Sequence, residues 1–403
     1  MDEITEESLQ KAEDAIAAKV IGNYPANTEI LALDYTNYYT YISSGNCRCK
    51  IAKRGKNKQK RNDLRQCSLA VVTAKDLGIP LFSHVYEGNR NDQTEFGEYI
   101  PLLKKRMPGF APPKTTLVFD GGSNTKENLE RLDMHYLCSF SLSYCKELYD
   151  IPADTYEVVV LEKGAKVAAY RTQKIIWGKE RTCVLSLSDA LYAGQERELK
   201  ENIRKTLDDL EKLDEQIRNP KSRIPKTAES LLKRAEKLLK RKYMKEIIQF
   251  QVSNAGITYE VDAEKETAIK EKYFGKKLLI TDRGDWSTEE ILGVYREQDC
   301  IEKIFRDSKD TSHCSLQPIF HWTDQKIRVH IFICLLGLTM SAVLQKEAEK
   351  RGLHLSNDRL LEELGGIRES WITEGNDATG KVLQKLEKMN DVQEKLWAII
   401  EEL

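Results

Sequence analysis

The sequence has 403 residues, a formal net charge of −1 and 32% charged residues. This length allows one large or two ordinary domains with a sizeable core. The total charge gives no argument for a nucleic-acid partner, so any such argument must come from the distribution of charge along the chain.

The nine cysteines are dispersed, and the pair Cys47 and Cys49 has neither zinc-knuckle nor redox spacing. Such a set is typical of buried thiols in a reducing cytoplasm.

Two segments bear on targeting. The first 20 residues, "MDEITEESLQKAEDAIAAKV", are acidic and amphipathic, which excludes a secretory signal. The longest apolar run, "IFICLLGLTMSAVL" at 331–344, has 14 residues. A run of this length is too short for a membrane span and predicts a buried core helix. We therefore expect a cytoplasmic protein without a membrane partner.

The N-terminal third predicts a mixed sheet. After a helix over 2–20, "ILALDYTNYYTYI" reads as two strand-like runs with a bend near Thr36–Asn37. "CSLAVVTA" and "GIPLFSHVYEG" continue an antiparallel meander, and "NDQTEFGEYIPLLKKRM" is a helix capped by Asn91 or Asp92. "TTLVFDGGSNTKENLERLDMHYLCSFSL" is a βαβ unit whose helix starts near Ser123. These elements predict an α/β fold with helices on the faces of the sheet.

The pattern changes from about residue 146 to residue 285. Hairpin-like strands precede two charge-rich helices over 194–217 and 227–248, and strands return after them. We interpret this block as an insertion. "STEE" at 287–290 is a capping box that opens the next helix. The predicted organisation is a helical lead (1–28), a first core part (29–145), the insertion (146–285), a second core part (286–345) and a C-terminal helical region (346–403).

Three acids stand out against this background. Asp34 interrupts a run of strong strand formers, and Asp120 follows an apolar strand directly before Gly-Gly. An alternative for Asp120 is a turn former or helix N-cap. In "YREQDCIEKIFRDSK" (295–309), Tyr295, Glu302 and Lys309 are seven residues apart and fall on one face of a predicted helix. The alternative for Glu302 is a solvated residue beside an apolar stripe.

Convergence of Asp34, Asp120 and Glu302 would require cations, because three carboxylates repel one another. Hard oxygen ligands without histidine or cysteine suit Mg²⁺ or Mn²⁺. Two such ions could activate a water or a 3′-hydroxyl and stabilise the leaving oxygen of a phosphodiester.

With these residues in place, the sequence resembles the DDE transposases of bacterial insertion sequences. It is most similar to the branch with the helix motif Tyr-x2-Arg-x3-Glu-x6-Lys, which Tyr295, Glu302 and Lys309 match. Gln298 occupies the arginine position, and Arg296 lies on a different face. The resemblance covers nearly all of 29–345, in the order "LALDYTNYYTYI", "KRGKNKQKRNDLRQ", "GIPLFSHVYEGNRNDQTEF", "LVFDGGSNTKENL" and "IEKIFRDSK…LQPIFHWTDQKIRVHIFICLLGL".

This resemblance implies a ribonuclease-H-like core, with a large α+β insertion before the last catalytic helix. It implies Mg²⁺-dependent (or Mn²⁺-dependent) DNA cleavage at element ends and strand transfer into target DNA. Asp34, Asp120 and Glu302 would be catalytic and would hold two metal ions per site. Tyr295 and Lys309 would contact phosphates, with Arg306 a weaker candidate. A homodimer would pair two ends on double-stranded DNA.

The tract from Arg48 to Arg65 is strongly basic, with nine Lys or Arg against one Asp. Its position beside the first catalytic strand favours contact with DNA phosphates over a merely solvated face. The predicted DNA-binding residues of this tract are Lys53, Arg54, Lys56, Lys58, Lys60 and Arg61. Trp177 in the insertion is expected in a core, with stacking on an unpaired base as the alternative. "PIFHW" (318–322) and His330 are expected to pack.

Two other functions stay open at this point. Only 33 residues precede Asp34, without a helix-turn-helix signal, although members of this branch usually carry a longer N-terminal region. A truncated, non-catalytic DNA-binding regulator is therefore the alternative to an active transposase, and Gln298 favours it as well. A general nuclease of the same fold is the weaker third candidate.

Overall fold

The computed structural model describes residues 3–24, 29–57, 61–75, 77–107, 114–225, 227–253, 255–296, 298–311, 315–373 and 382–402. The chain forms two compact units, each described by itself. The first unit combines Met1–Cys138 with Val294–Leu403, and the second is Ser139–Gly293. The predicted insertion, 146–285, lies within the second unit.

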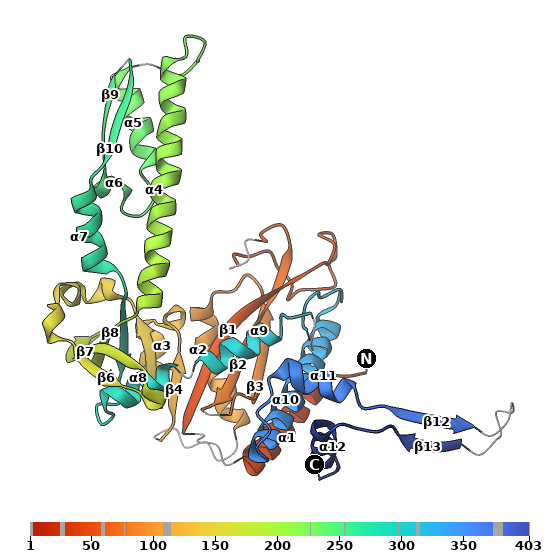
Figure 1. Cartoon of the computed structure of the whole chain (residues 1–403). Coiled ribbons are helices and arrows are strands. Elements are labelled where there is room, and N and C mark those ends of the chain that lie inside the picture. Colours follow the sequence, from red (N-terminus) through yellow and green to blue (C-terminus); the bar gives the residue numbers. More distant parts are fainter. Residues whose placement is uncertain are drawn as a thin grey trace. The chain divides into compact units, whose positions relative to one another are not determined.

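A mixed sheet forms the centre of the first unit (Figure 1). Its strands are β1 (Ile30–Thr40), β2 (Arg65–Ala74), β3 (Phe82–Glu87), β4 (Thr116–Phe119) and β5 (His135–Phe140), in the order β3-β2-β1-β4-β5. Strands β1, β2 and β3 are antiparallel, whereas β4 runs parallel to both β1 and β5. This order and direction confirm the predicted ribonuclease-H-like mixed sheet flanked by helices.

Strand β1 is continuous, so the predicted bend near Thr36–Asn37 is wrong. Its ladder with β2 runs without interruption from Leu31↔Ala74 to Thr40↔Arg65. The Asn37 amide donates a hydrogen bond across this ladder to Ser68 Oγ at 2.7 Å. A polar side chain that is satisfied within the sheet does not have to leave it.

Helices cover both faces of this sheet. The helices and remaining strands of the first unit are α1 (Glu6–Asn23), α2 (Asp92–Arg106), η1 (Gly121–Ser123), α3 (Lys126–Arg131), the end of α8 (Thr288–Arg296), α9 (Asp299–Asp307), α10 (Asp324–Lys350), α11 (Asn357–Gly365), β12 (Glu369–Thr373), β13 (Val382–Leu386) and α12 (Asp391–Glu402). On one face, Ala32 and Tyr38 of β1 share a core with Ile301 of α9. On the other, Phe119 packs against Phe96 of α2 with ring centroids 4.7 Å apart.

The motif over 295–309 is not one helix, contrary to prediction. Helix α8 ends at Arg296, α9 begins at Asp299, and Lys309 lies in a turn beyond α9. The backbone N–H of Gln298 donates a hydrogen bond to the carbonyl oxygen of Tyr295, three residues earlier, at 3.3 Å. Gln298 thus forms a tight turn. This turn allows Tyr295 and the buried Ile301 to meet their separate packing requirements.

Helix α10 is longer than the 14-residue apolar run from which it was predicted. It spans 27 residues because polar residues extend the helix at both ends of that run. By length and composition alone, α10 could cross a membrane, so the prediction that it is too short is wrong. A core helix passes the same test, and Ile327, Ile331 and Leu335 lie in the core shared with β1 and β2.

The second unit contains a sheet in the order β11-β8-β7-β6 and a helical extension. Its elements are η2 (Leu142–Tyr144), η3 (Lys146–Asp150), η4 (Ala153–Thr155), β6 (Glu157–Val160), η5 (Glu162–Gly164), β7 (Lys166–Ile176), β8 (Lys179–Leu187), α4 (Asp189–Arg218), α5 (Ala228–Leu238), α6 (Met244–Ile247), β9 (Ile248–Ser253), β10 (Gly256–Val261), α7 (Ala263–Tyr273) and β11 (Lys276–Thr281). Leu199, Leu210 and Ile217 of α4 form a core with α5 and the β9–β10 hairpin.

Three local predictions need correction, and one is confirmed. The second predicted helix ends at Leu238 rather than 248, and α7 occupies residues expected to be extended. The C-terminal region, expected to be helical, also contains the β12–β13 hairpin. The capping box is confirmed, because Ser287 and Glu290 each accept a hydrogen bond from the backbone amide of the other.

The first prediction concerns the packing of α9. Ile301 is fully buried in the core beneath β1 and β2. We expect Ile301→Ala to lower the free energy of unfolding of the first unit by about 2–5 kcal/mol, because it leaves a cavity. Hydrogen exchange of the β1 amides measures this change. Lys303→Ala, at an exposed position of the same helix, is the control and should change it by less than about 0.5 kcal/mol.

Candidate active site

Two of the three predicted acids lie side by side at the ends of one parallel register. The last pair of the β1–β4 ladder is Leu33↔Phe119, and Asp34 and Asp120 are the next residue on each strand. Asp120 keeps an extended backbone, with φ −83° and ψ 162°. Neighbouring strands are about 4.8 Å apart, so the two residues are adjacent.

Both carboxylates belong to the face of the sheet that α9 covers. Side chains alternate along a strand, so Asp34 shares a face with Thr36 and Tyr38. The Tyr38 hydroxyl lies 2.6 Å from Ser308 Oγ, directly after α9. In-register residues of parallel strands point to the same face, which places Asp120 on this side as well.

Tyr295 contacts the side chain of Asp120. Its buried hydroxyl donates a hydrogen bond to Asp120 Oδ1 at 3.2 Å. The alternative for Asp120, an N-cap, is only partly realised. Asp120 occupies the N-cap position of η1, but its side chain makes no capping hydrogen bond there. The carboxylate is exposed beside the tyrosine hydroxyl.

Lys309 approaches the same face from the other end of α9. Its ammonium donates a hydrogen bond to Thr36 Oγ1, two residues from Asp34 along β1. It also lies 5.3 Å from the centroid of the Tyr38 ring. Burial raises the pKa of Tyr38 above its usual value, so this tyrosine is a neutral partner for the lysine. Tyr295 and Lys309 therefore contact the two strands that carry the acids.

Glu302 lies on α9 between these two contacts and is exposed. Its neighbours Ile301 and Phe305 point into the core, which fixes the helix against β1 and β2. Arg306 is also exposed, and its guanidinium lies 3.6 Å from Asp307. A surface ion pair of this kind contributes little to stability.

The donor chemistry of the three carboxylates fits a hard divalent cation. Carboxylate oxygens are the ligands that Mg²⁺ and Mn²⁺ prefer. Within the described residues, however, no three His, Cys, Asp or Glu side chains lie together closely enough to hold a metal ion. The structure thus brings Asp34 and Asp120 together, with Glu302 on the helix over the same face.

A fourth acid beside this region was missed in the sequence. Asp92 begins α2, accepts a hydrogen bond from the Tyr86 hydroxyl at 3.1 Å, and borders the loop after Asp120. Its Oδ2 is 3.9 Å from the point where a Cβ on Gly122 would lie. Burial, followed by the Asp92 charge, raises the pKa of Tyr86, which keeps it a hydrogen-bond donor. The sequence offered Asn91 or Asp92 as the cap of this helix, and the structure confirms Asn91, whereas Asp92 is its first residue.

The basic loop that joins β1 to β2 is folded by one of its own arginines. The Arg65 guanidinium donates to the carbonyls of Ala52, Asn46 and Cys49. A side chain on Gly88 would meet the neighbouring strand, because its Cβ would lie 1.9 Å from the Gln66 carbonyl oxygen. The hydrogen bonds of Arg65 therefore hold residues 46–52 of the loop in a defined conformation.

The predicted cations of this loop have different surroundings. Arg54 and Lys56 are exposed and Lys53 is half-buried. Arg61 forms a bidentate pair with Asp63, with N–O distances of 3.0 and 2.9 Å. Lys58 and Lys60 lie outside the described residues.

Two other sequence candidates make packing contacts, whereas Phe320 and Trp322 of "PIFHW" are 70% and 56% exposed, so the expected packing of that segment is wrong for these two rings. Trp177 is half-buried, with its ring centroid 5.2 Å from Phe140 and 5.8 Å from Tyr144, so the core position expected from the sequence is realised only in part. His330 Nε2 is 3.3 Å from the Leu316 carbonyl oxygen.

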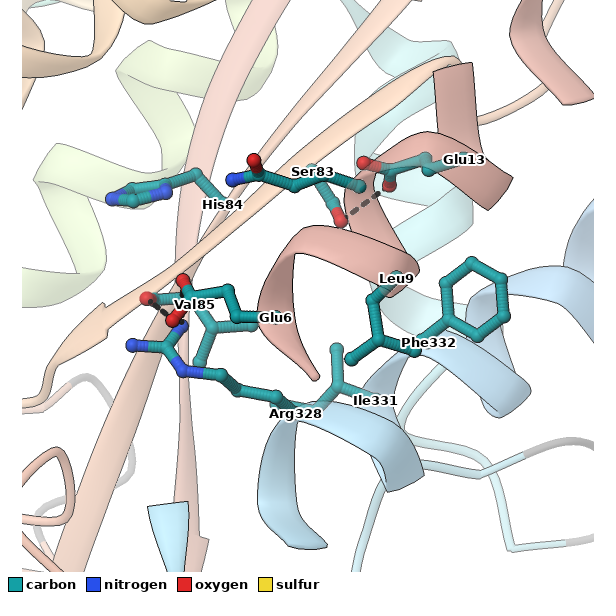
Figure 2. A pocket seen from close by; sticks show the side chains of 10 residues that line it. Glu6, Leu9, Glu13, Ser83, His84, Val85, Arg328, Ile331 and Phe332 are labelled. Atoms are coloured by element: carbon teal, nitrogen blue, oxygen red, sulfur yellow. Dashed lines mark hydrogen bonds and ion pairs between the residues drawn. The ribbon is translucent and has the colours of Figure 1, made fainter. Parts of the chain in front are cut away.

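The structure also has a small pocket between α1, β3 and α10 (Figure 2). Arg328 closes it by an ion pair with Glu6, and none of the predicted site residues lines it.

Comparison with known proteins adds a distant likeness. No protein-family model and no curated protein sequence matches this chain. Among solved structures, the chain is similar to a piggyBac transposase in a synaptic complex with hairpin DNA. The TM-score is 0.42 and the sequence identity 9%, and the match covers 89% of this chain. It covers 55% of the other chain, so this chain spans about half the length of that protein.

The second prediction tests the register at the site. We expect the double variant Asp34→Cys/Asp120→Cys to form a disulfide under mild oxidation, because adjacent strand residues meet the Cα spacing of a disulfide. Mass spectrometry of the linked peptides measures it. Asp34→Cys/Lys114→Cys is the control, since Lys114 is six residues from Asp120, roughly 20 Å along the strand. Equal cross-linking of both pairs would show that the register is different.

Proposed function

We propose that this protein is a DDE transposase that cleaves DNA at the ends of a mobile element and joins them to target DNA. The observation that carries the proposal is the adjacency of Asp34 and Asp120 on the face covered by α9, the helix with Glu302. The match of Tyr295, Glu302 and Lys309 to the motif of the bacterial branch supports it independently. Tyr295 and Lys309 both lie at this face, as a shared site requires.

Asp34, Asp120 and Glu302 are the proposed ligands of two Mg²⁺ or Mn²⁺ ions. When bound, such ions activate a water or a 3′-hydroxyl and stabilise the leaving oxygen of the phosphodiester. The protein's own part is to position carboxylates and phosphates, because phosphoryl transfer needs little side-chain covalent chemistry. Carboxylates at metal-sharing distance repel one another unless cations neutralise them. Asp34, Asp120 and Glu302 would hold the ions, and the ions would supply the positive charge that offsets the repulsion between these carboxylates.

Tyr295 and Lys309 are the proposed phosphate contacts next to the metals. Lys309 is a flexible cation held beside Asp34 through Thr36, and a phosphate oxygen is a stronger acceptor than a hydroxyl. Tyr295 holds Asp120 by the hydrogen bond that its hydroxyl donates. Arg306 is exposed on the same helix and is the weaker candidate.

The proposed partner is double-stranded DNA, both element ends and target, bound partly by the basic loop. Lys53, Arg54, Lys56 and Arg61 would contact phosphates without reading sequence. A homodimer is proposed because pairing two ends requires two sites. A cytoplasmic location is proposed from the free thiols of all described cysteines, which suit a reducing compartment.

One observation favours a different function, that of a non-catalytic DNA-binding regulator derived from a transposase. In the described part of the chain, no three potential ligands are grouped at metal-binding distance. Gln298 also stands where the motif has arginine. A regulator would keep the fold and the basic loop but would not cut.

The third prediction tests catalysis. We expect Asp34→Asn and Glu302→Gln each to lower the rate of Mg²⁺-dependent DNA cleavage by at least about 100-fold, because a metal ligand is removed. The DNA affinity should stay within about two-fold, since neither residue is in the basic loop. The substrate is labelled DNA that flanks the coding sequence in its own genome, and gel electrophoresis measures nicking and joining. Lys303→Gln on α9 is the matched control.

The outcomes separate the candidates. Nicks at the flanks alone that vanish in Asp34→Asn support the transposase. Cleavage of unrelated DNA without joining would identify a general nuclease. Binding without cleavage, in Mg²⁺ and in Mn²⁺, would identify the regulator, and normal cleavage by Glu302→Gln would remove that residue from the site.

The fourth prediction concerns the basic loop. We expect Lys53→Gln/Arg54→Gln/Lys56→Gln to weaken binding to any DNA sequence. The slope of log affinity against log salt should fall by roughly 0.9 for each phosphate that the loop no longer neutralises. Titration at several salt concentrations measures this slope. Lys200→Gln/Lys205→Gln/Lys233→Gln removes the same charge from exposed helical pairs of the second unit and is the control. An unchanged slope in the loop variant would mean that the loop does not meet DNA.

A further inference from the structure

Large exposed aromatic side chains lie where β1 ends and in the segment 319–324 that is hydrogen-bonded beside it. Tyr41 is 48% exposed, Phe320 70% and Trp322 56%. The rings of Tyr41 and Phe320 are stacked, with centroids 5.4 Å apart and planes inclined by 23°. Tyr39 meets Tyr41 edge to face at 5.9 Å. Such a cluster differs from single exposed apolar residues, which need no explanation.

The aromatic residues are held by the backbone rather than by loose loops. The Tyr41 amide donates to the carbonyl of the buried Ile319 at 3.0 Å. The Asn46 amide side chain donates to the Trp322 carbonyl at 3.0 Å. Asp324, two residues further, accepts the backbone amides of Lys50 and Ile51 at 2.7 and 3.0 Å. The rings are therefore presented in a preorganised arrangement, which lowers the entropic cost of binding.

The charge around these rings is positive. The same hydrogen bonds tie the segment 319–324 to the loop that carries the exposed Arg48, Lys50 and Arg54. The Arg61 guanidinium lies 5.7 Å from the centroid of the Tyr39 ring. Between Tyr39 and Arg65 the only acidic residue is Asp63, which pairs with Arg61. These cations would not stabilise the binding of an apolar partner protein, whereas they would pair with the phosphates of a nucleotide strand.

We infer that Tyr41, Phe320 and Trp322 form a stacking platform for an unpaired nucleotide of the DNA substrate. Base faces are hidden inside a duplex, so an exposed aromatic ring binds a base that is single-stranded, frayed or flipped out. Phe320 is the most exposed of these rings, and the exposed loop cations are available to the phosphates of the same strand. This inference deepens the proposed function and rests on it only in so far as DNA is the ligand.

The position of the platform sets which nucleotide it holds. Tyr41 follows Asp34 by seven residues, roughly 23 Å along an extended strand. The platform therefore lies apart from the proposed metal ligands, and the unpaired nucleotide that it holds is not the one at the cleavage point.

The test compares binding to paired and unpaired DNA without divalent metal, so that cleavage plays no part. Fluorescence anisotropy with a labelled 20-nucleotide single strand, and with the duplex of the same sequence, gives the two affinities. We expect Phe320→Ala and Trp322→Ala each to weaken single-strand binding by about ten-fold or more. Duplex binding should change less than two-fold. Phe320→Trp should restore single-strand binding. Trp371→Ala, an equally exposed aromatic on β12, is the matched control.

A second measurement does not depend on the alanine variants, which could misfold. Stacking on a base quenches tryptophan emission, so the single strand should quench the wild-type protein more than Trp322→Phe. Trp371→Phe should be quenched as the wild type is. Equal losses on single strand and duplex, or equal quenching in Trp322→Phe, would overturn the inference. So would loss of self-association in Phe320→Ala with unchanged DNA binding, which would assign the surface to a second copy.

The outcomes for the platform and for the proposed function can be told apart. Normal cleavage by Glu302→Gln would refute the catalytic proposal and leave single-strand binding as it is. Conversely, a cleaving enzyme whose Phe320→Ala variant binds single strands normally would retain the catalytic proposal and lose the platform.

Discussion

The parallel pairing of β1 with β4 is the constraint on which the candidate site depends. Paired residues of parallel strands point to the same face, so the pair Leu33 and Phe119 determines that Asp34 and Asp120, one residue further along, lie together on the other face. A shift of β4 by one residue would turn Asp120 into the opposite, buried face. The packing of Phe119 on Phe96 opposes that shift, because it would expose an apolar ring.

The second requirement is a helix fixed over that face, which α9 meets by combining a buried side with two polar contacts. Ile301 and Phe305 anchor the helix in the core, and the Tyr38 hydroxyl meets Ser308. Tyr295 and Lys309, before and after α9, reach the strands of the two acids. The three motif positions thus have different roles. Tyr295 and Lys309 hold α9 against the sheet, and Glu302 between them faces solvent.

Much of this could be predicted from the sequence, and the failures share a physical origin. Asp34 was recognisable because strong strand formers surround a charge, and Asn91 because caps are local. The break at Gln298 and the straight course of β1 depend on partners distant in sequence, which local patterns do not contain. Helix α7 was recognisable in retrospect, since Asp262 caps it by accepting from the Lys265 amide. The exposed rings at Phe320 could not be predicted, because composition does not distinguish a solvent-facing aromatic from a core one.

The exposure of Glu302 has a consequence for variants at this position. A residue that faces water adds little to the stability of the fold, so its replacement should leave a well-folded protein with an unchanged basic loop. Under the proposed function, such a variant would still bind the DNA ends without cutting them, and it would compete for these ends with the active protein.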